Sequence, residues 1–270
     1  MERKITVRNP KFSFVGNVPK YWWAGRALPT HLANGLNLVF PEGERFFIRS
    51  VRAFSKNISD PKLSERVAGF IAQEVQHGRE HESFFDTLRA EGYSIDRYLK
   101  FYTAFSFGFI EKISTRRLNL ATTAALEHYT ATIAENLLKD SFFKETANTT
   151  MRDLFYWHAA EEIEHKSVAF DVMTYANVSY FTRVSGMLMA TALLGGFWLL
   201  GTCMFMVQDR EFSFKKLIEQ TRQGFKFKRF QQYKMGHAIK HYLKRDFHPN
   251  QTGNETLADS FLETFNPSKA

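Results

Sequence analysis

The sequence predicts an all-α protein, and three observations carry this prediction. Hydrophobic side chains make up 44% of the 270 residues, which is enough for one sizeable core. The 15 glycines and 7 prolines are too few for the many tight turns of an all-β fold. Several long stretches also carry apolar residues at helical spacing without an internal breaker. We therefore expect four long helices and one shorter crossover helix.

The first two long helices are predicted from their start signals. Residues 1–35 are expected to form an irregular leader, and a helix is expected from Pro41, because proline suits a first helical position. Its apolar stripe consists of Phe46, Phe47, Val51 and Phe54. Asp60 and Pro61 are typical of an N-cap followed by the first helical residue. The second helix is therefore expected over 61–91, where Gly92 ends it.

The remaining helices of the bundle follow from aromatic and apolar spacing. Ser94 begins a short aromatic segment that serves as the crossover helix. Two further long helices fit residues 114–139 and 146–178.

An apolar segment follows the bundle. Residues 184–207 are 24 residues without a charge or a histidine, enough to cross a bilayer. Because Gly195 and Gly196 divide the segment, a hairpin on one leaflet is an alternative to a single helix. Packing against the bundle or against a second copy is another alternative. The small-residue pairs Gly186/Ala190 and Ala192/Gly196 favour such close approach, and a homodimer stays open.

The charge distribution suggests an acidic partner. The formal net charge is +8, and residues 208–248 hold eleven Lys and Arg against four Asp and Glu. This region also interleaves aromatics with cations, which suits a helix lying on an anionic membrane. A nucleic-acid partner is disfavoured, because no recognised binding motif accompanies the charge. We expect the protein in the cytoplasm or on the cytoplasmic side of the inner membrane.

Three parts therefore divide the chain. Residues 1–183 are expected to form a metal-binding helical bundle, and residues 184–207 a hydrophobic, membrane-associated segment. Residues 208–270 are expected to form a basic amphipathic region with a weakly ordered tail. The single Cys excludes a disulfide framework and a zinc ribbon.

Two Glu-x-x-His motifs carry the chemistry. Glu74 precedes His77 by three residues, as Glu162 precedes His165, and residues three apart share one face of a helix. A carboxylate and an imidazole placed in this way can bind one metal ion. Each motif also follows a helix with an interior glutamate. These are Glu44 before the first motif and Glu127 before the second.

The order Glu, Glu-x-x-His, crossover, Glu, Glu-x-x-His is that of ferritin-like carboxylate bundles. The expected metal ligands are Glu44, Glu74, His77, Glu127, Glu162 and His165. Four carboxylates can neutralise two divalent ions, and imidazole suits iron. We therefore expect two divalent metal ions, iron by preference, with manganese or zinc as alternatives.

Four stretches carry a family resemblance. They read ERFFIRSVR, EVQHGREHE, LEHYTA and WHAAEEIEHKSVAFDV. The chain resembles the ferritin-like di-iron superfamily over roughly 40–175. Over most of its length it is more closely similar to a bacterial family of predicted metal-dependent hydrolases. The resemblance implies a ferritin-like four-helix bundle with a crossover helix, followed by the hydrophobic helix or hairpin and the basic helix.

Several residues near the motifs could complete the site. His158 lies four residues before Glu162, a spacing that resembles di-iron arylamine N-oxygenases, in which a third His binds metal. His81 lies one turn beyond His77 and could be a ligand, a supporting donor or a proton relay. Glu161 and Gln73 precede the two motif glutamates and could orient a His on the facing helix. His128 is expected to point away from the site. Solvated helix-face charges are expected at Glu80, Glu82 and Glu164.

Three functions remain open at this point. The leading expectation is oxygen-dependent oxidation of a small or lipid-like substrate at two irons, with dioxygen as co-substrate. The alternative is a binuclear metal-dependent hydrolase, as the family resemblance implies. The third is a non-enzymatic metal-binding membrane protein.

Overall fold

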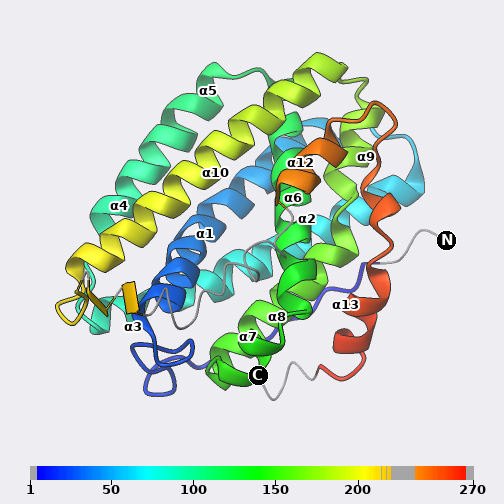
Figure 1. Cartoon of the computed structure of the whole chain (residues 1–270). Helices are drawn as coiled ribbons and strands as arrows, with labels where there is room; N and C mark the ends of the chain where they lie inside the picture. Colours follow the sequence, from blue (N-terminus) through cyan, green and yellow to red (C-terminus); the bar gives the residue numbers. More distant parts are fainter. Residues whose placement is uncertain (1–4, 214, 217, 220–234, 266–270) are drawn as a thin grey trace.

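The computed structural model describes residues 5–213, 215–216, 218–219 and 235–265, and this part of the chain is an all-α bundle, as expected (Figure 1). Its helices are α1 Ala27–Ser55, α2 Pro61–Ser83, α3 Phe85–Ala90, α4 Asp96–Tyr102, the π-helix η1 Thr103–Ile110, α5 Glu111–Ile113, α6 Arg116–Leu138, α7 Ser141–Thr146, α8 Thr149–His165, α9 Val168–Tyr175, α10 Tyr180–Gln208, α12 Met235–Tyr242, the 3₁₀ helix η3 Pro249–Thr252 and α13 Glu255–Leu262. The described residues contain no strand beyond one isolated bridge between Trp23 and Ala147.

Helix α1 begins well before the expected start at Pro41, which lies in its interior. An interior proline removes one backbone hydrogen bond and costs about 3 kcal/mol or more. Buried packing on both sides of it, by Leu36, Leu38 and Phe47 among others, offsets this cost. The leader is correspondingly shorter than predicted and runs up to Arg26.

The third long helix, α6, lies close to its predicted range, whereas the ranges predicted for the second and fourth helices are each divided between two helices. Asp60 caps α2 by accepting a hydrogen bond from the backbone N–H of Lys62, as the sequence indicated. Phe84 separates α2 from α3, and residues 166–167 separate α8 from α9. At this second break, the buried Lys166 Nζ donates to Thr252, Asn254 and Glu255.

The crossover consists of three consecutive helical segments, α4, η1 and α5. It lies along α10 in Figure 1, and Tyr98 Oη donates to the carbonyl of Phe197 over 2.8 Å. Half of the residues of the central segment η1 are exposed, but Ser106 is buried.

Helix α10 is one unbroken helix, so the hairpin suggested by Gly195 and Gly196 does not form. It packs chiefly along α6 and α1, which corresponds to the packing alternative. Gly186 allows a close approach to α6, since a Cβ there would lie 2.5 Å from the carbonyl carbon of Ala121. Among the described residues, α10 is the one helix long and apolar enough to cross a membrane. Only 28% of its most apolar 18-residue stretch is buried.

The C-terminal region is more ordered than expected. Helix α13 packs against α8, and α12 packs against α6, so residues 249–265 are not a loose tail. Buried Ala258 and Leu262 supply the apolar face of α13. Most of the predicted basic interfacial helix, residues 220–234, lies outside the described residues.

Candidate metal centre

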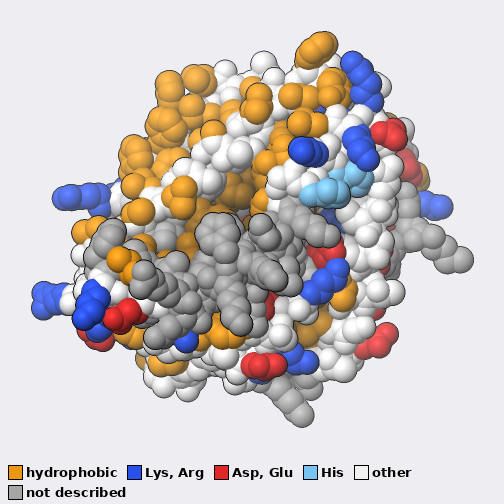
Figure 2. All heavy atoms as spheres, in the orientation of Figure 1, with side chains coloured by type: hydrophobic (Ala, Val, Ile, Leu, Met, Phe, Trp, Pro, Cys, Tyr) orange, Lys and Arg blue, Asp and Glu red, His pale blue; other side chains and the backbone are white. Residues whose placement is uncertain are grey.

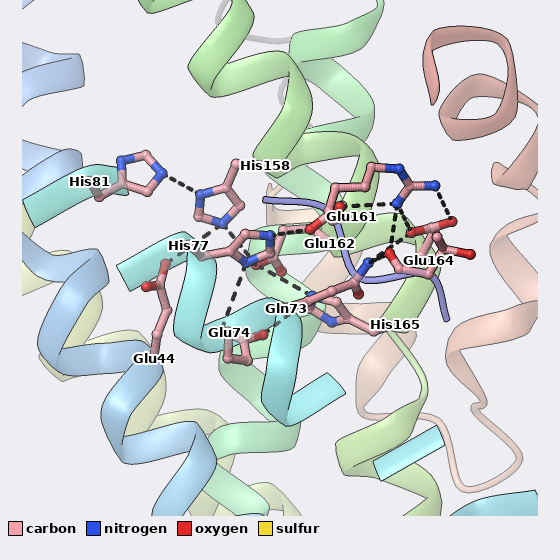
Figure 3. A network of polar contacts seen from close by, with 12 residues as sticks. Glu44, Gln73, Glu74, His77, His81, His158, Glu161, Glu162, Glu164 and His165 are labelled. Carbon is pink, nitrogen blue, oxygen red and sulfur yellow. Dashed lines mark hydrogen bonds and ion pairs between the residues drawn. The ribbon is translucent and has the colours of Figure 1, made fainter. Parts of the chain in front are cut away.

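Four helices direct ionisable side chains into one buried space (Figure 3). Helix α1 contributes a Glu, α2 a Glu and two His, α6 a Glu, and α8 two His and a Glu. Each of these side chains belongs to a residue at most 4% exposed. They are Glu44, Glu74, His77, His81, Glu127, His158, Glu162 and His165.

The two Glu-x-x-His motifs form the first group. One ligand atom from each of Glu74, His77, Glu162 and His165 lies within 4.8 Å of the others. His165 Nε2 lies 3.2 Å from Glu74 Oε1, across the α8–α2 interface. The i and i+3 spacing places each Glu and His on one face, and the two helices bring these faces together.

Glu44, His81 and His158 form a second group, in which one ligand atom of each residue also lies within 4.8 Å of the others. His81 Nε2 and His158 Nδ1 form a short hydrogen bond. The other ring nitrogen of His158, Nε2, lies 2.8 Å from Glu162 Oε1. Glu162 therefore links the two groups. The sequence left His81 open as a ligand, a supporting donor or a proton relay. In the structure it belongs to the second group of potential ligands, next to His158.

Glu127 occupies a different position from the other predicted ligands. Its Oε2 lies 3.0 Å from His165 Nδ1, and it belongs to neither group. This contact fixes the orientation of the His165 ring. Glu127 Oε1 makes no hydrogen bond to any described residue, so one oxygen stays free.

Burial and mutual repulsion perturb the carboxyl groups. Burial, strengthened by the nearby Glu162, raises the pKa of Glu44 well above its usual value. Burial likewise raises the pKa of Glu74 well above its usual value, with Glu127 adding repulsion. Burial also raises the pKa of Glu127, to about 7. Close carboxylates of this kind are stable together only when protons or cations neutralise them.

The imidazoles respond to the same surroundings in two ways. Burial lowers the pKa of His77 and of His81 well below the usual value. Burial would also lower the pKa of His165, but Glu127 and Glu162 raise it to about 9. Neutral imidazole is the form that binds metal ions.

Buried oxygen and nitrogen atoms that lack a hydrogen-bond partner show whether these residues fit a pair of metal ions. Seven buried atoms of the centre make no hydrogen bond to any described residue: both Oε atoms of Glu44 and of Glu74, His77 Nδ1, Glu127 Oε1 and His165 Nε2. Leaving such groups unpaired is costly, by about 1–3 kcal/mol each and more for charged groups. Two divalent cations would satisfy them, so the residues fit a metal pair.

An outer layer of contacts holds His77. Its Nε2 donates to Glu161 Oε2 over 3.0 Å, so Glu161 orients a His on the facing helix, as the sequence suggested. Arg8 in turn donates to Glu161 Oε1 over 3.0 Å and to Glu164 Oε2 over 2.7 Å. Gln73 does not orient a His; its Nε2 donates to Glu164 and to the Thr6 carbonyl.

Two of the glutamates expected to be solvated are buried. Glu80 is 4% exposed and accepts a hydrogen bond from the backbone N–H of Phe12. The side chain of Glu164 is 1% exposed. The leader covers both, which helical periodicity could not reveal. Glu82 pairs with Arg45 at the surface, as expected.

Arg8 is the functional residue that sequence reasoning missed, because it stands outside any helix or motif. His128 was correctly expected to point away from the site. Its Nε2 lies 3.0 Å from the carbonyl of Ala238 on α12.

A family model described as predicted metal-dependent hydrolase matches residues 6–253 of the chain. The match includes Arg8 and every residue of the two groups. No curated protein and no solved structure matches the chain.

Proposed function

The chain belongs to the family of predicted metal-dependent hydrolases, and we propose that it hydrolyses an ester or amide at a pair of divalent metal ions. The observation that carries this proposal is the buried pair of Glu and His groups, joined at Glu162. Hydrogen bonds within the described residues do not account for the centre, because seven of its buried nitrogen and oxygen atoms have no hydrogen-bond partner among them.

Each group would hold one metal ion. The motif group offers two carboxylates and two imidazoles, and the second group offers one carboxylate and two imidazoles. Glu162 lies between them and could bridge. When bound, the metal pair supplies Lewis acidity toward a carbonyl oxygen and lowers the pKa of water.

The chain's own residues would fix the geometry of this reaction. Glu161 and Arg8 hold the His77 ring, and Glu127 holds the His165 ring, so that the opposite nitrogen of each faces the centre. Thr130 Oγ1 donates to Glu162 Oε2 in a short hydrogen bond and limits its rotation. Such supporting contacts typically alter metal affinity or activity 10- to 100-fold when removed.

Oxygen-dependent oxidation at two irons is the second candidate. The observation that favours it is the carboxylate-rich donor set beside an apolar cavity, which Glu44 and Glu162 both line. Iron in such ligand sets activates dioxygen in the carboxylate bundles that the sequence resembles.

Metal reconstitution under controlled oxygen separates the two candidates. We expect the zinc- or manganese-loaded protein to hydrolyse p-nitrophenyl esters without oxygen, and Glu74→Gln to lose this activity. The matched control is Glu82→Gln, an exposed glutamate on the same helix. Absence of hydrolysis with every metal, together with oxygen consumption by the Fe(II)-loaded protein, would replace the hydrolase proposal with the oxidase.

A further inference from the structure

A narrow apolar cavity leads away from the candidate metal centre. It has a volume of about 50 Å³ and touches Glu44 and Glu162. Leu193 and Leu194 of α10 and Phe107 of η1 also line it. The cavity therefore lies between α10 and the crossover, and its lining suits an apolar chain.

Among the described residues that line this cavity, Glu44, Ser106 and Asn119 each carry a buried polar atom without a hydrogen-bond partner. Ser106 is 3% exposed, and its hydroxyl makes no hydrogen bond to any described residue. A buried hydroxyl without a partner costs about 1–3 kcal/mol, which a polar atom of a ligand would recover. It belongs to the π-helix η1, a form that occurs frequently at functional sites.

A wide groove of about 1180 Å³ opens on the other side of η1. Cavity and groove share three lining residues, Phe107, Glu111 and Asn119, so the two spaces adjoin. The groove is bordered by four cations and two acids, namely Arg49, Lys100, Lys112, Arg116, Glu42 and Glu111.

The side chains that border the groove carry a net positive charge. Arg49 pairs with Glu111 over 2.6 Å, and Glu42 pairs with Arg45 outside the groove. Lys100 and Lys112 are exposed and form no ion pair with any described residue. An anionic group is therefore the ligand that this groove complements.

The surface beside η1 is apolar. Hydrophobic side chains gather over α10 and the crossover in Figure 2. They include Phe101, Phe105 and Phe109 of the crossover and Leu188 and Leu199 of α10, which are 40–67% exposed. An exposed apolar area of this kind typically marks a site of interaction.

We propose that the substrate is an anionic amphiphile with a single apolar chain, an inference that rests on the proposed function of the metal centre. Its head lies in the groove beside Lys100 and Lys112, and its chain passes Phe107 into the cavity. Glu44 and Arg49 are five residues apart on α1, or about 7.5 Å along its axis. The ester or amide bond that reacts therefore interrupts the apolar chain at a distance from the charged head.

Direct binding tests this proposal separately from catalysis. Titration calorimetry of the full chain with dodecanoate, both metal-loaded and after chelation, should show saturable binding of one equivalent in both states. Dodecanol should bind at least tenfold more weakly. Binding that disappears on chelation would overturn the proposal, because the carboxylate would then be recognised by metal. Equal affinity for dodecanol would contradict the anionic head.

Two substitutions locate the ligand. Leu193→Trp should fill the cavity and weaken dodecanoate binding at least tenfold, whereas Leu199→Trp, on the outer face of the same helix, should leave it unchanged. Lys112→Glu, at an exposed position, should weaken binding several-fold without affecting the fold. If Leu193→Trp and Lys112→Glu both bind as the wild type does, the amphiphile site lies elsewhere. Hydrolysis of short esters by the wild type is measured in parallel. Hydrolysis without dodecanoate binding would overturn this proposal alone, whereas absence of hydrolysis with every metal would overturn the hydrolase proposal.

Vesicles identify the source of the amphiphile. Co-sedimentation with phosphatidylglycerol vesicles but not with phosphatidylcholine vesicles would identify the membrane as the source. Sedimentation with neither, combined with dodecanoate binding, would identify the dissolved amphiphile. Equal sedimentation with both would contradict recognition of the anionic head.

Discussion

His77 Nε2 donates to Glu161 Oε2 over 3.0 Å, across the interface between α2 and α8. This bond leaves His77 Nδ1 facing the centre, without a hydrogen-bond partner among the described residues. Glu161 is itself held by Arg8 from the leader, so an irregular segment far away in the sequence supports a potential metal ligand.

Replacing Arg8 should therefore weaken metal binding. In Arg8→Ala, Glu161 loses the hydrogen bond from the Arg8 guanidinium, so His77 loses its fixed orientation. We expect metal affinity to fall about 10- to 100-fold. Competition with a chromophoric chelator measures the affinity. Arg8→Lys, which keeps the charge without the planar fork, should give an intermediate value. An unchanged affinity in Arg8→Ala would show that the leader has no part in positioning His77.

Removing one buried carboxylate should raise the melting temperature of the metal-free protein and lower that of the metal-loaded protein. Burial and neighbouring acids raise the pKa of Glu74, so its charged form is disfavoured in the metal-free fold. Metal-free Glu74→Gln should therefore melt at least about 2 °C above metal-free wild type. With metal present, the order should reverse, because the variant lacks a ligand. Calorimetry with and without chelator checks both, and a variant less stable in both states would contradict a ligand role for Glu74.

Helix α10 should tolerate an added methyl group at one glycine and not at another. In Gly186→Ala the new Cβ would lie 2.5 Å from the backbone of Ala121, and the fold should lose about 1–3 kcal/mol. In Gly196→Ala nothing lies within 4 Å, and the stability should stay unchanged or rise by up to about 1 kcal/mol. Urea unfolding measures both. Equal effects would mean that α10 does not pack on α6 at Gly186.

Asp209 should make stability depend on acid pH. Burial would raise its pKa, but hydrogen bonds from His31, Lys20 and Tyr21 lower it to about 2. The folded-state pKa lies below the unfolded value, so the contribution is complete above about pH 4 and is lost toward pH 2.

Asp209→Asn should therefore cost about 1–3 kcal/mol at pH 7, and the difference from wild type should shrink below pH 4. Urea unfolding at pH values from 7 to 3 measures this difference in the free energy of unfolding. Glu211→Gln is the matched control, because Glu211 also contacts Lys20 but is 61% exposed. A difference between Asp209→Asn and wild type that stays constant with pH would exclude this origin.

Much of the fold was predictable because it depends on local signals. The cap at Asp60 places the start of α2, and the apolar spacing of 114–139 places α6 within two residues of its observed range. The start of α1 was not predictable from Pro41, because tertiary packing overrides the local preference of proline. The continuity of α10 through Gly195 and Gly196 depends on packing in the same way.

The candidate site was predictable as far as it follows helical spacing. The two Glu-x-x-His motifs and His158 converge, since each lies on one helical face. Two features required the fold. His81 lies close to Glu44 because the packing of α2 on α1 brings these two residues together. Arg8 contacts Glu161 because the leader packs against α8. Neither contact leaves a periodic signal in the sequence.

Metal stoichiometry tests the central claim most directly. After reconstitution and gel filtration, elemental analysis should find two divalent metal ions per chain in the wild type and fewer than two in Glu162→Gln, which removes the carboxylate that links the two groups. Glu82→Gln should retain two. A wild-type protein that binds no metal, or a Glu162→Gln variant that keeps both ions at unchanged affinity, would contradict the account.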